Sequence, residues 1–172
     1  STLFPYTTLF RSLDNGFGGA TAARYLRQLA PEVKVTLVEP ATRFYTCPFS
    51  NLYLGGLRSF ESIGHGYDGL RADGVDVVHA RAEDVDATAR TVRLSNGRTL
   101  KWDRLVLSPG IDFRWDALPG YDEAASWIAP HSWKAGKQTQ LLYRQLRAMP
   151  DGGTFVMVIP DLPLSRDRKS VV

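Results

Sequence analysis

The 172-residue chain has a single cysteine, Cys47, only three histidines and no long apolar run. One cysteine cannot form an internal disulfide, and no group of cysteines and histidines has the spacing of a zinc site, so we expect no bound metal. No stretch approaches the roughly 20 apolar residues that a membrane-spanning helix needs, so we expect no membrane span. The start of the chain also lacks the basic-then-apolar layout of a secretory signal.

The composition is that of an ordinary globular protein. Hydrophobic residues make up 44% of the chain and charged residues 23%, which excludes disordered and fibrous classes. The length would suit one domain. We therefore expect a chain that buries a hydrophobic core.

The two ends resemble translated sequencing adapter. TLFPYTTLFRS near the start and DRKSVV at the end can be back-translated into DNA strings, the second being the reverse complement of part of the first. Unrelated tails would rarely do this, so we expect residues 1–12 and 167–172 to be non-native. Arg11 contributes one positive charge, and Asp167, Arg168 and Lys169 together contribute one more, so the formal charge of +3 falls to about +1 without the ends. The basic balance is then no argument for nucleic acid, and we expect no nucleic-acid partner.

A glycine-rich turn at 16–19 opens an Ala/Leu-rich stretch in which Ala23, Leu26 and Leu29 have helical spacing. At the start of a helix, bare backbone can approach a pyrophosphate closely, and the helix N-terminus favours its negative charge. The G-x-G-x-x-G register would place its first glycine at position 14, where the chain has Asp. We expect that glycine and the strand before it to have been overwritten. The candidate residues are Gly16, Phe17, Gly18 and Gly19; a simple glycine turn is the alternative.

Glu39 strengthens the nucleotide interpretation. It ends the β-branched run VKVTLVEP, which predicts a buried parallel strand, and it lies 20 residues after Gly19. An acid at this spacing can accept hydrogen bonds from ribose hydroxyls and disfavours a 2′-phosphorylated nucleotide. A solvated acid at a strand end is the alternative.

A third motif is WDRLVLSPG, which spans Trp102–Gly110 and combines an acid-containing lead, an apolar strand and a turn at Pro109 and Gly110. It resembles the second flavin fingerprint of flavoproteins with two dinucleotide-binding domains. Following a glycine-rich loop and a strand-end Glu, it favours FAD over a free nicotinamide cofactor, with Pro109 and Gly110 as further cofactor-binding candidates.

Between and after these motifs the pattern alternates strands and helices. Helix potential lies near Ser50–Leu54, Tyr67–Ala72 and within Trp133–Met149, and strands are expected at Val75–His79, Thr91–Leu94, Thr99–Trp102 and Arg104–Leu107, with a hairpin turn at Asn96-Gly97. The run DGGTFVMVIP predicts a buried strand that opens a second domain. His65, His79 and His131 form no defensible triad, so we interpret them as surface or packing residues.

Long stretches resemble the flavoprotein subunits of flavocytochrome c sulfide dehydrogenases. They are FGGATAARYLRQLAPEVKVTLVEP, RFYTCPFSNLYLGGL, ESIGHGYDGLRADGVDVVHARA, DRLVLSPGIDFRWDALPGYDEAA and HSWKAGKQTQLLYRQLRAMPDGG. The resemblance covers about Gly16 to Pro160 and includes irregular segments, where fold alone imposes little on sequence.

The resemblance implies a role for Cys47, which stands in the Tyr45-Thr46-Cys47 segment. The family's Tyr-Thr-Cys cysteine binds the flavin 8α-methyl group through a thioether. A thiolate can add at that activated methyl, and the covalent bond generally raises the flavin potential. A free thiol and a buried filler residue are the alternatives.

The resemblance also implies the reaction: sulfide is oxidised at a redox-active cysteine pair beside FAD, and electrons pass to a c-type cytochrome subunit in the periplasm. Neither cysteine of that pair can be located in this chain, so we name no catalytic residue and expect the chain by itself to be inactive. Alternatives are a sulfide:quinone reductase-like flavoprotein, an NAD(P)H-dependent disulfide reductase-like flavoprotein, or a non-catalytic nucleotide-binding remnant.

Together these features predict an α/β fold. We expect a Rossmann-like FAD-binding domain over residues 13–115, with a parallel sheet, helices and an added antiparallel hairpin, and a linker with the start of a second nucleotide-type domain over 116–166.

Overall fold

The computed structural model describes residues 7–12, 17–110, 112–115 and 118–158. The chain forms two compact units, one of residues 1–44 and 65–112 and the other of residues 45–64 and 113–172. The connecting segments β3 (Phe44–Tyr45) and β4 (Gly64–His65) pair as a two-stranded sheet.

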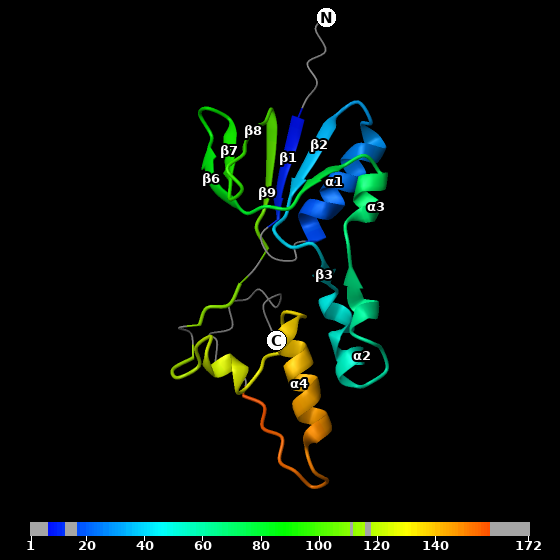
Figure 1. The fold of residues 1–172 in the computed structure, drawn as a ribbon, viewed down its shortest axis with the longest axis vertical. Coiled ribbons are helices and arrows are strands. Elements are labelled where there is room, and N and C mark those ends of the chain that lie inside the picture. The colour runs from blue at the N-terminus through cyan, green and yellow to red at the C-terminus, as the bar shows by residue number, and fades with distance from the viewer. Residues whose placement is uncertain (1–6, 13–16, 111, 116–117, 159–172) are drawn as a thin grey trace, which may run out of the picture. The chain divides into compact units, whose positions relative to one another are not determined.

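The first unit is built on a four-stranded sheet in the order β5-β2-β1-β9 (Figure 1). Its strands are β1 (Thr7–Ser12), β2 (Lys34–Val38), β5 (Asp76–Val78) and β9 (Arg104–Ser108). β1 pairs in parallel with β2 and β9, and β2 pairs in parallel with β5. Taken in chain order, these strands have the 3-2-1-4 arrangement of a dinucleotide-binding fold.

Both faces of this sheet are covered. Helices α1 (Phe17–Leu29) and α3 (Asp68–Ala72) lie on one side, and the antiparallel strands β6 (Ala82–Asp86), β7 (Thr91–Leu94) and β8 (Thr99–Lys101) lie on the other (Figure 1). Side chains of β2 alternate between the two layers: Val35 and Leu37 pack with Ala23 of α1, whereas Val38 packs with Val92 of β7. A parallel strand covered on both faces needs the continuous apolar run that VKVTLV supplies.

The strand before the glycine-rich turn is formed by residues that we expect to be non-native. Thr7–Ser12 is β1, with Leu9 opposite Thr36 on one neighbour and Leu105 on the other. That these residues overwrote a native strand stays a prediction. The TTLFR segment is rich in β-branched, aromatic and apolar residues, which fit a pleated strand whatever their origin.

The regular elements that lie wholly within the second unit are helical. It contains the short helical turns η1 (Cys47–Phe49), η2 (Glu61–Ile63) and η3 (Ala125–Trp127), with helices α2 (Ser50–Leu54) and α4 (Lys137–Ala148). The rings of Tyr53 and Tyr143 join α2 to α4 with centroids 4.6 Å apart. The amide of Gln138 donates to the hydroxyl of buried Ser126 at 2.9 Å, which ties η3 to the start of α4.

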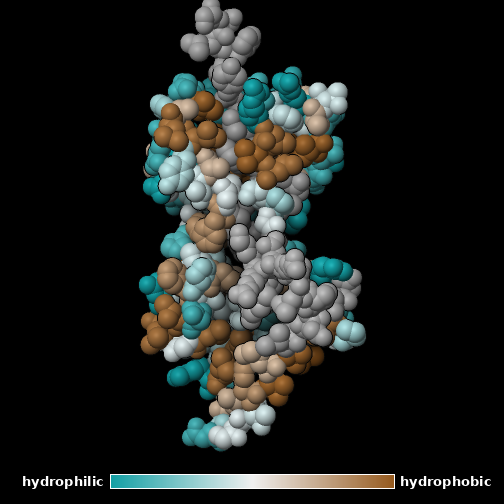
Figure 2. All heavy atoms as spheres, turned by 180° about the vertical axis from the view of Figure 1, so that it is seen from behind, coloured by the Kyte–Doolittle hydropathy of each residue, from teal (hydrophilic) through white to brown (hydrophobic). Residues whose placement is uncertain are grey.

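The strand expected in DGGTFVMVIP is not formed over its described part. Residues 153–158 have no strand pairing, and the side chains of this segment are exposed, among them Phe155 (53%) and Val156 (74%). A parallel strand exists only where neighbouring strands hydrogen-bond to it, and the second unit offers no such strand among its described residues. Brown apolar side chains are visible at the surface of the molecule in Figure 2.

Candidate functional site

The candidate site lies at the carboxyl ends of the parallel strands in the first unit. Because parallel strands end at the same edge of a sheet, Glu39 after β2, His79 after β5 and Ser108 at the end of β9 share that edge. Helix α1 begins nearby, and its residues contact β1, β2 and β9. Ligands of open α/β sheets bind outside this edge, where the strand order reverses.

The start of α1 packs tightly on the end of β9. A β-carbon on Gly18 would lie 2.9 Å from the hydroxyl oxygen of Ser108, and one on Gly19 would lie 3.4 Å from the Ser108 β-carbon. Glycine is therefore needed here for close helix-to-strand approach, which is one of the roles of a fingerprint glycine. Phe17, the first residue of α1, makes an edge-to-face contact with Phe44 at 5.6 Å. Gly16 lies outside the described residues.

Glu39 is buried, with 1% of its surface exposed. Its N–H donates to the carbonyl of Val78 at 3.0 Å, which extends the pairing of β2 with β5. Its carboxylate oxygen Oε1 accepts the N–H of Ala41 at 3.0 Å, so the side chain shapes the turn that follows the strand. This hydrogen bond offsets part of the cost of burying a carboxylate.

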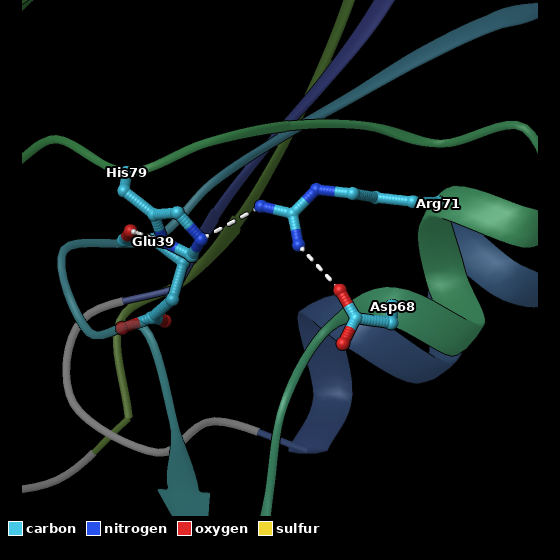
Figure 3. Close-up of polar contacts among 4 residues, drawn as sticks. All are labelled: Glu39, Asp68, Arg71 and His79. Carbon is cyan, nitrogen blue, oxygen red and sulfur yellow. Dashed lines mark hydrogen bonds and ion pairs between the residues drawn. The ribbon is translucent and has the colours of Figure 1, made fainter.

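A chain of polar contacts links Glu39, through His79, to Arg71 and Asp68 of α3 (Figure 3). Nδ1 of His79 lies 3.1 Å from the carbonyl oxygen of Glu39, and Nε2 of the same ring lies 2.8 Å from Nη2 of Arg71. Arg71 in turn donates to the carboxylate of Asp68 at 3.1 Å, an ion pair one helical turn apart. The polar chain thus runs from exposed Asp68 to buried Glu39.

Tyr67 packs against this cluster. It is 5% exposed and packs its ring edge against His79 at 5.6 Å. Burial, and then the nearby charge of Glu39, raises the pKa of Tyr67 well above its ordinary value of 10.0. The phenol therefore stays protonated beside the acid.

The turn after β9 contains the remaining candidates of this unit, Pro109 and Gly110. Gly110 has a φ of +74°, a left-handed conformation that glycine adopts without steric cost. Pro109 directly follows Ser108, the residue that α1 contacts. The WDRLVLSPG motif and the glycine-rich helix start thus meet at Ser108.

Cys47 belongs to the second unit, whereas the other described candidates belong to the first. It is the first residue of η1 and is partly exposed. Its thiol donates to the carbonyl of Trp133, and the Ser50 hydroxyl donates to the carbonyl of Cys47 at 2.7 Å.

Sequence reasoning missed the arrangement of His79 and Arg71 around Glu39. A signal existed, because His79 ends the run predicted as a strand at Val75–His79 and so falls at the same sheet edge as Glu39. Arg71 could not be assigned in this way, because its contact depends on how α3 packs.

The described residues hold no group of three or more His, Cys, Asp or Glu side chains arranged to bind a metal ion. Across the same part of the chain, none of the helices is both long and apolar enough to cross a membrane.

The chain is similar to several flavoproteins in sequence. A sulfide dehydrogenase (flavocytochrome c) flavoprotein chain from Chlorobaculum thiosulfatiphilum is 69% identical over 39 residues, which are 23% of this chain and 81% of that sequence. A sulfide-quinone reductase from Aquifex aeolicus is 31% identical over 135 residues, which are 76% of this chain and 31% of that protein.

Solved structures share the fold. The sulfide:quinone oxidoreductase of Aquifex aeolicus superposes with a TM-score of 0.67 at 21% identity, over 83% of this chain and 32% of that one. Putidaredoxin reductase in its covalent complex with putidaredoxin also gives 0.67, at 24% identity over 82% and 34% of the two chains. The chain thus spans about a third of these longer relatives, and the predicted α/β, Rossmann-like class is confirmed.

The family model for pyridine nucleotide-disulphide oxidoreductases matches residues 15–147, which include the glycine-rich helix start, Glu39 and the turn after β9. The chain therefore belongs to the pyridine nucleotide-disulphide oxidoreductase family.

Proposed function

We propose that this chain carries the FAD-binding part of a sulfide-oxidising flavoprotein whose electrons go to a c-type cytochrome subunit. The observation that carries the proposal is Glu39, a buried acid held at the carboxyl end of β2 beside the glycine-rich start of α1. The 69% identity with a sulfide dehydrogenase flavoprotein chain supports the substrate and the partner. The same resemblance supports a periplasmic location.

The residues present fit the adenosine and pyrophosphate parts of FAD. The Glu39 carboxylate is a hydrogen-bond acceptor for ribose hydroxyls, and the first turn of α1 offers backbone N–H groups and the positive end of the helix dipole to the pyrophosphate. Gly18 and Gly19 let α1 approach the end of β9, where Pro109 and Gly110 turn the chain. FAD, when bound, supplies an acceptor for two electrons that can release them singly.

Flavin binding can be tested with the purified chain. We expect FAD to bind with quenching of its fluorescence, and Glu39→Gln to weaken its affinity by about tenfold or more, because a charge-assisted hydrogen bond is lost. Exposed Glu32 supplies the matched control, Glu32→Gln. FMN, which lacks the adenosine, should show no dependence on Glu39. Absence of FAD binding by the folded chain, or equal affinity of both variants, would contradict the proposal.

We also propose that Cys47 is linked to the flavin 8α-methyl group. In this linkage Cys47 would hold the flavin through a carbon–sulfur bond; forming that bond from a thiol and a methyl group releases two protons and two electrons, and the bound flavin ring would supply the two-electron acceptor. The partial exposure of Cys47 at the start of η1 supports the proposal. Acid precipitation should leave the flavin on the wild-type chain and release it from Cys47→Ser; release from both would exclude the linkage.

The sulfide-reacting centre is not part of the proposed site. A redox-active cysteine pair cannot form within a chain whose single cysteine is Cys47. We therefore expect the purified chain to show no sulfide-dependent reduction of cytochrome c, and such reduction would overturn this assignment.

A second candidate is a sulfide:quinone reductase-like function, favoured by the 31% identity over 135 residues with the Aquifex protein. The electron acceptor separates the two. The intact protein should reduce cytochrome c in preference to a soluble quinone if the first proposal holds, and the reverse preference would favour the second. An NAD(P)H-dependent disulfide reductase would instead oxidise NAD(P)H. A non-catalytic remnant would show none of these three activities.

A further inference from the structure

The contacts of His79 favour one tautomer of its ring. The carbonyl oxygen of Glu39, 3.1 Å from Nδ1, can only accept a hydrogen bond, and the guanidinium of Arg71, 2.8 Å from Nε2, can only donate one. Nδ1 must therefore carry the proton and Nε2 a lone pair.

This ring fixes the peptide that carries the Glu39 carboxylate. The Glu39 N–H already donates to Val78 at 3.0 Å, and the His79 ring holds the carbonyl on the other side of the same residue. Oε1 is held by the N–H of Ala41. Main chain and side chain of Glu39 are thus anchored to the end of β5 and to the following turn, which leaves the carboxylate little freedom to swing.

Arg71, in α3, favours this tautomer of His79. Its second nitrogen is occupied by Asp68, so the guanidinium is held at both ends between a carboxylate and the imidazole. Arg71 and Asp68 are partly or largely exposed, with 42% and 96% of their side-chain surface accessible, so the pair adds little stability by itself. The guanidinium of Arg71 faces Nε2 of His79, so it favours the tautomer in which the Nδ1–H faces the carbonyl of Glu39.

We propose that His79 is a positioning residue for nucleotide binding: Arg71 holds the Nδ1–H tautomer, and the ring orients Glu39 toward the ribose hydroxyls of a dinucleotide. The proposal rests on the assignment of Glu39 to the ribose. A purely structural role would depend on the shape of the ring against Tyr67, since the two rings meet edge to face. Shape and hydrogen bonding can be separated by substitution.

Two variants make the separation. His79→Phe keeps an aromatic ring against Tyr67 and removes both hydrogen bonds, whereas His79→Asn loses the ring and keeps an amide N–H near the position of Nδ1. We expect His79→Phe to bind FAD about tenfold more weakly than the wild type, the value of about one hydrogen bond, and His79→Asn to bind within about threefold. Circular dichroism should confirm that both remain folded, and FMN affinity should not change.

A second readout does not involve the flavin. Long-range nitrogen–proton NMR spectra of the full chain should show His79 as the Nδ1–H tautomer, and Arg71→Met should allow the other tautomer to appear, whereas Arg58→Met, which removes an exposed arginine elsewhere, should not. The Nε2–H form in the wild type would overturn the proposal.

The outcomes separate the inference from the function on which it rests. The FAD site stands if the wild type binds FAD and Glu39→Gln lowers the affinity for FAD. Positioning by hydrogen bonding is nevertheless wrong if His79→Phe binds FAD as tightly as the wild type. It is also wrong if His79→Asn binds FAD as weakly as His79→Phe. If the wild type fails to bind FAD, the proposed function and this inference both fail.

Discussion

The hydroxyl oxygen of Ser108 lies 2.9 Å from the point that a β-carbon on Gly18 would occupy. We expect Gly18→Ala to destabilise the chain by about 1 kcal/mol, because the Ser108 hydroxyl must rotate to make room. Ser108→Ala removes the oxygen and leaves only a β-carbon 4.0 Å away, so the double variant should recover most of the loss. Urea unfolding of the four proteins measures this coupling.

The control for that cycle is Gly69→Ala in α3, where a β-carbon would meet nothing within 4 Å. Its effect should add to that of Ser108→Ala without coupling, because the two sites share no partner. A coupling of zero between Gly18 and Ser108 would mean that α1 is not packed on β9 as described.

Gly74 and Arg27 form a second constrained contact. Gly74 has a φ of +83°, and a β-carbon there would lie 2.9 Å from Nη2 of Arg27, whose guanidinium also donates to the carbonyl of Val33 at 2.7 Å. We expect Gly74→Ala to cost about 2 to 3 kcal/mol in unfolding free energy, from backbone strain and displacement of Arg27 together.

Gly97 isolates the backbone part of that cost. Its φ is +80°, and nothing lies within 4 Å of its hypothetical β-carbon, so Gly97→Ala should cost only about 1 kcal/mol. Chemical denaturation compares the two, and equal losses would show that the Arg27 contact adds nothing.

The sequence predicted local elements well where periodicity and turn chemistry act within a few residues. The bounds expected at Ser50–Leu54 and Thr91–Leu94 match α2 and β7, and the helix after the glycine-rich turn is α1. β6 (Ala82–Asp86) was missed because AEDVD has the composition of a solvated loop, and only pairing with β7 makes it a strand. The strand expected in DGGTFVMVIP was wrong because its apolar run needs neighbouring strands.

The candidate site was predicted in part. Glycine spacing and an acid at a strand end are recognisable within a short stretch of sequence. Gly18 and Glu39 could therefore be proposed as candidates from the sequence. The contact of Gly18 with Ser108 and the bond from Arg71 to His79 join residues brought together by packing, which no spacing rule encodes. The cofactor-binding roles of all the candidates stay predictions: Gly16, Phe17, Gly18, Gly19, Glu39, Cys47, Pro109 and Gly110.

Tyr67 offers a test of the environment of Glu39. Because its folded-state pKa lies above the unfolded value of 10.0, the stability it contributes is fully present below pH 10 and is lost as the pH rises through the folded pKa. Tyrosinate absorbance should show one tyrosine that titrates only with unfolding, and Tyr67→Phe should remove it. Glu39→Gln should lower the pKa of Tyr67, because the acid's charge is the second cause of the shift after burial.

His131 in the second unit should make stability fall in acid. Burial, and then the charge of Lys134, lowers the pKa of His131 below its ordinary 6.5, and its ring contacts Phe113 at 4.1 Å. Because the unfolded chain takes up this proton more readily, the stability that His131 contributes is fully present above pH 6.5 and is lost as the pH falls through the folded pKa.

His131→Phe, which keeps an aromatic ring beside Phe113, should therefore flatten the decline of the thermal midpoint between about pH 7 and pH 5. Lys134→Met should flatten it less, since it removes only the smaller cause. A decline as steep in His131→Phe as in the wild type would show that other groups titrate on unfolding and that His131 is not held neutral by its surroundings.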